Sequence, residues 1–598
     1  MENIQVEEFY NSRIKKEESA ERRLKGRSRF YLYAKLISFL GAAVWGYYAY
    51  IDENFVETII ALVCLIFYIF VFILDDRCIV RISQVRELLG FCRKEVSALG
   101  GDYSSFDSGK EYINPQHEYS YDLDVFGEKS LYQRINRTVT KIGRDRLAEK
   151  LAHLNTDKKN ILEAQEAIVD LAKMDDWRLR FLVRPFVESY PKQLSSVVGQ
   201  DKYGFFIMKS KLPYVMIIAT LIILVLAILS YVAWSFFFMM FAIQVGVTIS
   251  VGRMSSKVSG QTNDLHKEFK GYLVLIDDIV TANYSSAMLR DLQHGLSEDG
   301  SNSAIALHRL SSILNLFNQR SNELMCILLN GLFLYDVLLI RMFARWSERY
   351  MPHVDRWLDC IAEIDALVSM GNYAANHPQN VEAEILNEGE NIIVEGNGIY
   401  HPFLQYEKAV PNDFRLSKTE VAIVTGANMA GKSTFLRTLG VSFIMACNGI
   451  PVCAKSFRFS VVSLFSSMRT ADDLSKDISY FNAELLRLQQ LVRHVKSHPY
   501  TLVILDEILK GTNSRDKLKG SIMFLEEISK QRVGVVVATH DLELSDLEKQ
   551  HPKVYHNYCF EIELSEHVKY SYKIKRGVAH NLNASYLLSG ILKELGNN

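Results

Sequence analysis

The sequence predicts an α/β domain in the C-terminal part of the chain, behind an all-α region that carries apolar helix hairpins. Three observations lead to this fold class. Residues 421–447 have the pattern of a strand, a glycine-rich loop and a helix, and residues 501–505 and 533–538 are two further strand-like runs that end in polar residues. Upstream lie four long apolar segments. Helices of soluble proteins rarely run this long without a polar face.

The glycine-rich loop reads G-x-x-x-x-G-K-S, the phosphate-binding pattern of P-loop NTPases. A strand precedes it and a helix follows it, so backbone N–H groups and the positive helix end would face bound phosphates. We expect ATP here, with Lys432 on the β- and γ-phosphates and Ser433 on Mg²⁺. The nucleotide-binding residues would be Gly426, Ala427, Asn428, Met429, Ala430, Gly431, Lys432, Ser433 and Thr434.

Carboxylates and a histidine follow the two later strand-like runs. Asp506 and Glu507 come directly after residues 501–505, and His540 follows residues 533–538. Because parallel strands end at one edge of a sheet, these groups would meet at the phosphate loop. Asp506 is then the second Mg²⁺ residue, Glu507 the general base for the attacking water, and His540 a sensor of the γ-phosphate. Solvated acids and a structural histidine are the alternative interpretation.

These motifs resemble those of the MutS family. Residues 426–434 are similar to its phosphate loop, with Ala427 and Ala430 where the family usually has Pro and Gly, and residues 506–516 are similar to its extended magnesium motif. The resemblance implies an ABC-ATPase-like domain of the MutS type that hydrolyses ATP with Mg²⁺. The Leu-Ser-Gly-Gly-Gln signature of ABC transporters does not occur.

Residues 471–484 resemble the family segment that reaches the nucleotide of a partner subunit. In the family a serine there contacts the γ-phosphate across the dimer, which makes Ser479 the candidate in this chain and implies a homodimer. Tyr480 stands where the family usually has Thr. An ordinary amphipathic helix over residues 479–491 is the alternative.

The resemblance continues upstream, over roughly residues 121–200 and 340–590. Residues 123–143 are similar to the start of the MutS core, and His401-Pro402 to the lead-in of its ATPase domain, although Tyr400 replaces the usual Arg. The Phe-x-Glu wedge of the mismatch-reading domain and the connector domain find no counterpart. Ordinary mismatch recognition is therefore not expected.

Four apolar segments predict two transmembrane hairpins: residues 31–50 with 58–74, and 212–231 with 236–251. A bilayer core of about 30 Å needs about 20 helical residues, and these segments fit that length or fall slightly short. Buried core helices are the alternative. Lys and Arg flank the outer ends of both pairs, whereas Asp52, Glu53 and Glu57 occupy the first turn, so both hairpin ends and the ATPase domain should face the cytoplasm. We expect a multi-pass protein of the cytoplasmic (inner) membrane.

The remaining composition is consistent with this arrangement. A formal net charge of −1 gives no global attraction to nucleic acid, and eight scattered cysteines suggest neither a metal site nor a disulfide framework. The predicted division is a charged lead (1–28), a first hairpin (29–75), a helix and linker (76–121), a helical core (122–375) with the second hairpin at 212–251, and the ATPase domain (380–590).

The sequence leaves more than one function open. A membrane-tethered, dimeric MutS-like ATPase that acts on DNA follows from the resemblance. An ATP-driven membrane machine that does not act on DNA fits the apolar hairpins. A non-enzymatic scaffold with a regulatory nucleotide is disfavoured by the intact Lys432, Asp506 and Glu507.

Overall fold

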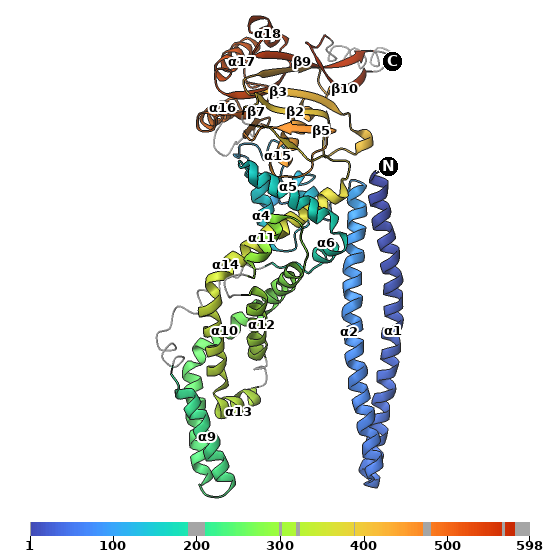
Figure 1. The fold of residues 1–598 in the computed structure, drawn as a ribbon, viewed down its shortest axis with the longest axis vertical. Coiled ribbons are helices and arrows are strands. Elements are labelled where there is room, and N and C mark those ends of the chain that lie inside the picture. Colours follow the sequence, from blue (N-terminus) through green and yellow to red (C-terminus); the bar gives the residue numbers. More distant parts are fainter. Residues whose placement is uncertain are drawn as a thin grey trace, which may run out of the picture. The chain divides into compact units, whose positions relative to one another are not determined.

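The computed structural model describes residues 2–188, 210–297, 302–318, 323–387, 389–469, 480–564 and 568–580 (Figure 1). Contacts within the chain define two compact units. Unit 1 contains residues 1–136, 150–183 and 370–598, and unit 2 contains residues 137–149 and 184–369.

A six-stranded sheet forms the centre of the C-terminal domain in unit 1. Its strand order is β10-β9-β4-β8-β7-β6, and every neighbouring pair is parallel except β10 with β9. The strands are β4 (Val421–Gly426), β6 (Ser463–Ser467), β7 (Thr501–Asp506), β8 (Val533–Thr539), β9 (Tyr555–Leu564) and β10 (Val568–Arg576).

The register of the three central strands brings their carboxyl ends level. Thr425 of β4 pairs with Thr539 of β8, and Asp506 of β7 pairs with Ala538 of β8. β4 and β8 are buried along their whole length, as expected for Val- and Ile-rich strands covered on both faces. The residues that follow the three strands therefore emerge at one edge of the sheet.

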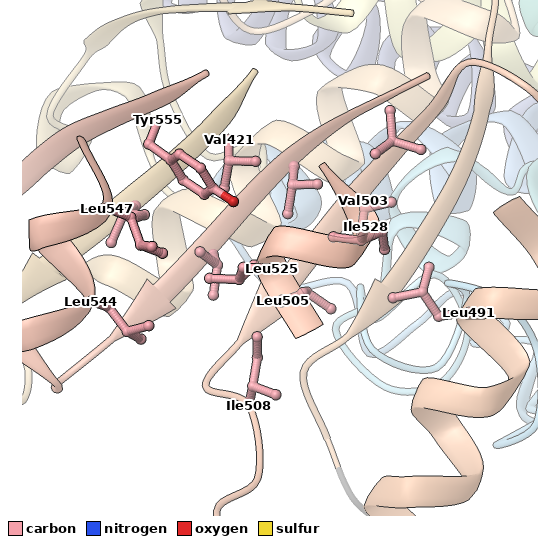
Figure 2. Close-up of a cluster of buried hydrophobic side chains, with 14 of the residues drawn as sticks. Val421, Leu491, Val503, Leu505, Ile508, Leu525, Ile528, Leu544, Leu547 and Tyr555 are labelled. Carbon is pink, nitrogen blue, oxygen red and sulfur yellow. The ribbon is translucent and has the colours of Figure 1, made fainter. Parts of the chain in front are cut away.

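Helices pack against this sheet and bury the apolar side chains of its central strands. α16 (Tyr480–Ser497) and α17 (Ser514–Ile528) supply Leu491 and Leu525 to a buried cluster with Val503 of β7 (Figure 2). α15 (Lys432–Cys447) directly follows the phosphate loop and is buried over most of its length. η6 (Leu542–Ser545) and α18 (Asp546–Gln550) complete the cluster.

A smaller sheet has the order β1-β5-β2-β3, with three strands before the phosphate loop in the sequence and β5 after it. Its strands are β1 (Glu384–Ile385), β2 (Ile392–Ile399), β3 (Asn412–Ser417) and β5 (Ser456–Phe459), and η4 (Tyr406–Lys408) lies between β2 and β3. The helices η1 (Lys110–Tyr112), α3 (Leu131–Ile135), α5 (Lys158–Lys173) and α6 (Asp175–Leu182) also belong to unit 1.

The N-terminal part of unit 1 is a hairpin of two long helices, α1 (Glu2–Asp52) and α2 (Phe55–Leu99), drawn in blue in Figure 1. Ion pairs join their polar ends, Glu18 with Arg93 and Glu21 with Arg86. The side chains toward the turn are apolar and exposed. The predicted lead, first hairpin and following helix are thus two uninterrupted helices.

A buried polar cluster joins the N-terminal hairpin to the end of α14 (Tyr335–Asn376) within unit 1. Glu95 of α2 is fully buried, and its carboxylate accepts hydrogen bonds from Asn372 Nδ2 (3.2 Å) and Asn376 Nδ2 (2.9 Å). Tyr10 of α1 donates to Asn376 Oδ1 at 2.8 Å, and Arg178 Nε lies 3.3 Å from Asn372 Oδ1. Buried charges and amides of this kind are stable only when they are paired.

Helices make up unit 2. They are α9 (Leu212–Ile228), α10 (Trp234–Val280), α11 (Ala287–Gly295), α12 (Ser303–Asn318), α13 (Glu323–Phe333) and most of α14, with the first part of α4 (Lys141–Ala152). α9 and α10 form the hairpin expected at residues 212–251.

Two features of unit 2 were not foreseen. The apolar helix α13 packs against α9 and α10, and the chain bends by 75° at Leu334 before α14 begins. Asp365 of α14 accepts hydrogen bonds from the backbone N–H groups of Val139 and Thr140 and from Thr140 Oγ1, which anchors the start of α4.

By length and apolar composition, one helix in the described part of the chain, α2, is suited to cross a bilayer, and its apolar window is almost entirely exposed. The bent pair of α13 and α14 passes the same test together. α9 and residues 234–250 of α10 are apolar but shorter. The two predicted transmembrane hairpins are therefore not confirmed and stay a prediction.

Candidate functional site

The phosphate loop has the backbone geometry that its glycines predict. Gly431 has φ 108°, in the left-handed region that favours glycine. A side chain at Gly426 would place its Cβ atom 2.7 Å from the carbonyl oxygen of Phe560 on β9, so the loop cannot accommodate one without moving that strand. Ala427 and Ala430, which depart from the usual family residues, are each 2% exposed and fit the buried side of the loop.

Lys432 begins α15 and turns its ammonium group back over the loop. Its Nζ donates hydrogen bonds to the carbonyl oxygens of Gly426 (2.8 Å) and Ala427 (3.0 Å). Burial lowers the pKa of Lys432 to about 8, and the carboxylates of Asp506 and Glu507 oppose that shift. A cation partly stripped of water and held beside the loop is suited to bind phosphate oxygens.

Glu507 is held by its backbone as well as by its side chain. It follows β7 in the left-handed region, with φ 60°, and its N–H donates to the carbonyl oxygen of Ala538 on β8 at 2.9 Å. Its Oε1 lies 3.2 Å from His540 Nε2, and its Oε2 lies 3.8 Å from Lys517 Nζ. The carboxylate is thus fixed at the edge where β7 and β8 end.

His540 lies between the base candidate and the lysine. Its ring nitrogens are 3.4 and 3.5 Å from Lys432 Nζ. Burial, reinforced by the positive charge of Lys432, lowers the pKa of His540, and Glu507 opposes this. A neutral imidazole donates one N–H and accepts with its other nitrogen, so His540 can connect Glu507 to a group near Lys432.

Two residues are predicted to bind Mg²⁺, which is the small number of protein ligands that this ion usually has in nucleotide sites. Ser433 is exposed in the first turn of α15, and Asp506 is half-buried at the end of β7. Among the described residues no cluster of three or more His, Cys, Asp or Glu side chains is placed to bind a metal. Mg²⁺ in nucleotide sites takes one or two protein oxygens together with phosphates and water, so a serine and one carboxylate suffice.

The structure brings most of the predicted site residues to one edge of the sheet. His540 contacts both Lys432 and Glu507, and Asp506 is close enough to influence the pKa values of Lys432 and His540. Asn428, Met429 and Thr434 are exposed around the loop. Ser479 lies outside the described residues, and its role stays a prediction. α16 begins at Tyr480, and its apolar face packs into the domain core.

Sequence reasoning missed two residues at this site. Lys517 of α17 contacts both Glu507 and Asp541, the latter at 3.2 Å, and it is the residue after the magnesium-motif segment 506–516. Tyr572 of β10 lies over the loop, with its ring 3.1 Å from the place where Gly431 would carry a Cβ atom. The position of Lys517 directly after the magnesium-motif segment could have drawn attention to it, whereas no sequence pattern points to Tyr572.

Comparison with known proteins gives a consistent result. Residues 422–589 match MutS domain V. The chain is 33% identical to the DNA mismatch repair protein MutS of Aquifex pyrophilus over 226 residues, which are 37% of this chain and 26% of that protein. It is 32% identical to MutS of Desulfitobacterium hafniense over 224 residues, again 37% and 26% of the two chains. The probable DNA mismatch repair protein Msh6 of Drosophila melanogaster is 28% identical over 218 residues, 35% of this chain and 18% of that protein.

The matches span about a quarter of the length of these relatives or less, and the stretch that matches MutS domain V contains the strands of the six-stranded sheet. That domain has the phosphate loop and the three level strand ends described above, and it is of the P-loop ATPase type. The resemblance read from residues 426–434 and 506–516 is confirmed by these matches. By these matches, the C-terminal domain of the chain, over residues 422–589, is similar to MutS domain V.

Proposed function

We propose that this protein is a membrane-tethered MutS-type ATPase that binds and hydrolyses Mg²⁺-ATP in a dimer. The observation that carries the proposal is the contact of His540 with both Lys432 and Glu507 at the edge where β4, β7 and β8 end. ATP and Mg²⁺ come from the family, whose members are ATPases. The chemistry of the site fits both.

Each residue has a distinct role in this proposal. The ammonium group of Lys432 exchanges the two loop carbonyls for the β- and γ-phosphates, while Ser433 and Asp506 hold Mg²⁺. Glu507 accepts a proton from the attacking water. His540 turns its single N–H from Glu507 to the γ-phosphate and thereby senses whether that phosphate is present.

Lys517 neutralises part of the negative charge at this edge. Its ammonium is shared by Glu507 and Asp541, so it helps to hold the base carboxylate in position. Most of the rate enhancement would come from positioning and charge stabilisation, as in other phosphoryl transfers.

The dimer is the second part of the proposal. Ser479 would contact the γ-phosphate bound to the partner subunit, so ATP would favour the closed pair of domains. A ligand shifts such an equilibrium by its difference in affinity for the two states. A test is the mass of the Glu507→Gln variant in detergent with and without Mg²⁺-ATP, with Ser479→Ala in the same background as the comparison. A closed dimer that forms equally well with Ser479→Ala would remove the serine from this role.

Membrane tethering is proposed from composition and exposure. Both helices of the N-terminal hairpin expose long apolar faces, with Ile37 72% exposed and Phe70 56% exposed. Exposed apolar surface of this extent is unfavourable in water. α9 and the start of α10 offer a second apolar pair, and the cytoplasmic face of the inner membrane would carry the ATPase domain. Labelling of introduced cysteines along residues 212–251 by a water-soluble thiol reagent would contradict the second membrane hairpin if every position reacted.

We propose that the ATP-driven conformational change acts on DNA, because the relatives are named as DNA mismatch repair proteins. The alternative is a membrane machine that does not act on DNA, which the exposed apolar helices favour. The decisive experiment measures ATP hydrolysis by detergent-purified protein with and without duplex, mismatched and branched DNA. Stimulation that weakens with salt supports DNA, because phosphate contacts release counterions. ATP hydrolysis that no DNA changes supports the alternative, and no hydrolysis under any condition contradicts both.

A further inference from the structure

A groove of about 550 Å³ lies between α12 and α14 in unit 2. The two helices run antiparallel, as two contacts show. Trp346 Nε1 of α14 donates to the carbonyl oxygen of Ala306 near the start of α12, and Tyr335 OH near the start of α14 donates to that of Leu316 near the end of α12. Neither the ATP site nor the family comparison, which covers only the C-terminal domain, accounts for this groove.

The polar lining of the groove is cationic. Three arginines, Arg309, Arg345 and Arg349, reach it from the two helices, and none of the described residues that line it is acidic. Arg309 is held by a hydrogen bond from its Nη1 to Tyr350 OH at 3.2 Å, and Arg349 lies over the ring of Tyr350 at 5.4 Å. Three guanidinium groups without a lining carboxylate form a site for an anion, and phosphate matches their geometry well.

The rest of the lining is apolar. Met342 and Ile305 expose their apolar side chains in the groove, and the buried Trp346 and Ile313 lie beneath them in its lining. Trp346 already uses its N–H on Ala306, so its remaining surface is the apolar ring. The groove therefore pairs a phosphate-binding rim with a hydrocarbon-binding wall, which is the chemistry of an anionic amphiphile.

The position of the groove along α14 sets where such a ligand would lie. Arg341, one turn before Arg345, donates to the carbonyl oxygen of Ser210 at 2.8 Å and stacks on Tyr214 at 5.0 Å, where the apolar helix α9 begins. At about 1.5 Å per residue, Arg345 and Arg349 lie about 6 and 12 Å further along the helix. The headgroup layer on each side of a bilayer is about 5–8 Å thick. Arg345 thus lies within the headgroup layer that follows the end of the apolar helices, and Arg349 lies one helical turn beyond Arg345.

We propose that this groove binds an anionic phospholipid, with Arg309, Arg345 and Arg349 on its phosphate and Met342 and Ile305 along its acyl chain. This inference rests on the membrane placement proposed above. A nucleic acid is the less favoured occupant, because the arginines share the groove with exposed apolar side chains. Basic pockets beside membrane helices on the cytoplasmic side are suited to acidic headgroups.

The test measures lipid binding to the full-length protein in detergent by native mass spectrometry. Equal amounts of phosphatidylglycerol and phosphatidylcholine are offered, and the ratio of the two bound lipids is recorded. Each basic residue near an anionic headgroup changes binding by about fivefold, so Arg345→Gln should lower the phosphatidylglycerol preference by about that factor. Arg345→Gln with Arg349→Gln should lower it by about 25-fold if the two act independently. The matched control is Arg290→Gln, which removes an exposed arginine of α11 outside the groove and should leave the ratio unchanged.

A flotation assay on liposomes separates this inference from the membrane proposal. Wild-type protein that floats with liposomes but shows no preference for phosphatidylglycerol, or a preference that Arg345→Gln leaves intact, overturns the lipid site alone. Wild-type protein that stays in solution without detergent overturns the membrane placement itself. A short DNA duplex that displaces phosphatidylglycerol from the wild type, and binds more weakly to Arg345→Gln, assigns the groove to nucleic acid and also overturns the proposal.

Discussion

Replacing Glu507 with glutamine isolates the chemical step from the architecture of the site. The two side chains have almost the same shape, and the backbone N–H of residue 507 stays bonded to the carbonyl oxygen of Ala538. A glutamine amide can still occupy the space beside His540 Nε2 and Lys517 Nζ, which lie 3.2 and 3.8 Å from the native carboxylate. It cannot take a proton from water. The variant should fold, bind ATP and fail to hydrolyse it.

The expected magnitude follows from that single loss. A positioned general base contributes about 10²- to 10⁴-fold to a reaction rate, or about 2.7–5.4 kcal/mol of barrier. We therefore expect kcat to fall by that factor while the affinity for ATP stays within about fivefold or improves, since one negative charge beside the γ-phosphate is gone. Phosphate release at saturating ATP measures the first quantity, and equilibrium binding of ATP measures the second.

Glu527→Gln is the matched control, because Glu527 pairs with Lys530 on the surface of the same domain and lies outside the site. It should leave both quantities unchanged. Wild-type turnover in Glu507→Gln would refute the role of Glu507 as base. Loss of ATP binding together with turnover would instead show that the carboxylate serves to hold His540 and Lys517 in place.

Three further predictions concern charge, packing and the buried cluster. Because the pKa of Lys432 is lowered to about 8 and bound phosphates favour the protonated lysine, ATP affinity should be flat below pH 8 and fall by up to tenfold per pH unit above it, measured by equilibrium binding. Gly143→Ala would place a Cβ atom 2.1 Å from Asp365 Oδ2, so it should displace that carboxylate and destabilise unit 2 by about 3 kcal/mol, measured as a lower thermal midpoint. Glu95→Ala leaves the side-chain amides of Asn372 and Asn376 without their acceptor and should cost about 2–4 kcal/mol in the same assay.

Each of these has its own comparison. Lys432→Arg remains protonated throughout, so its weaker ATP binding should show no slope between pH 7 and 9.5, and an equal slope in both proteins would assign the effect to another group. Gly90→Ala is the control for Gly143→Ala, since a Cβ atom at Gly90 meets nothing within 4 Å and a helical alanine should stabilise α2 slightly. An unchanged midpoint in Glu95→Ala would mean that water replaces the lost carboxylate.

The phosphate loop and its neighbours could be predicted because their signals are local. Strand, glycine loop and helix follow one another within residues 421–447, and the positions of Glu507 and His540 follow from the rule that parallel strands end at one edge. Tyr572 could not be predicted in this way. It reaches Gly431 from β10, the one antiparallel strand of the sheet, whose register slips between Tyr570 and Ile574. Such a slip depends on contacts that no periodicity in the sequence records.

In the helical regions too, local features could be predicted from the sequence and features that depend on distant contacts could not. The apolar segments were evident, but α1 and α2 continue far beyond them, because the charged flanks form helix as readily as the apolar centre and are stabilised by ion pairs between the two helices. α13 was missed because eleven residues are too few to suggest a membrane segment, and its role depends on packing against Phe241 of α10, close to Gly331. The end of α14 is fixed by Glu95, more than 270 positions away in sequence.

The two carbonyl contacts of Lys432 have a consequence for ligand selectivity. Before a nucleotide can occupy the loop, the ammonium group must break its hydrogen bonds to the carbonyl oxygens of Gly426 and Ala427. Only a ligand with a β- or γ-phosphate offers oxygens that replace these two hydrogen bonds. AMP and adenosine have neither phosphate. The cost of breaking the two hydrogen bonds of Lys432 is therefore recovered by nucleoside di- and triphosphates but not by monophosphates, which would bind the site more weakly.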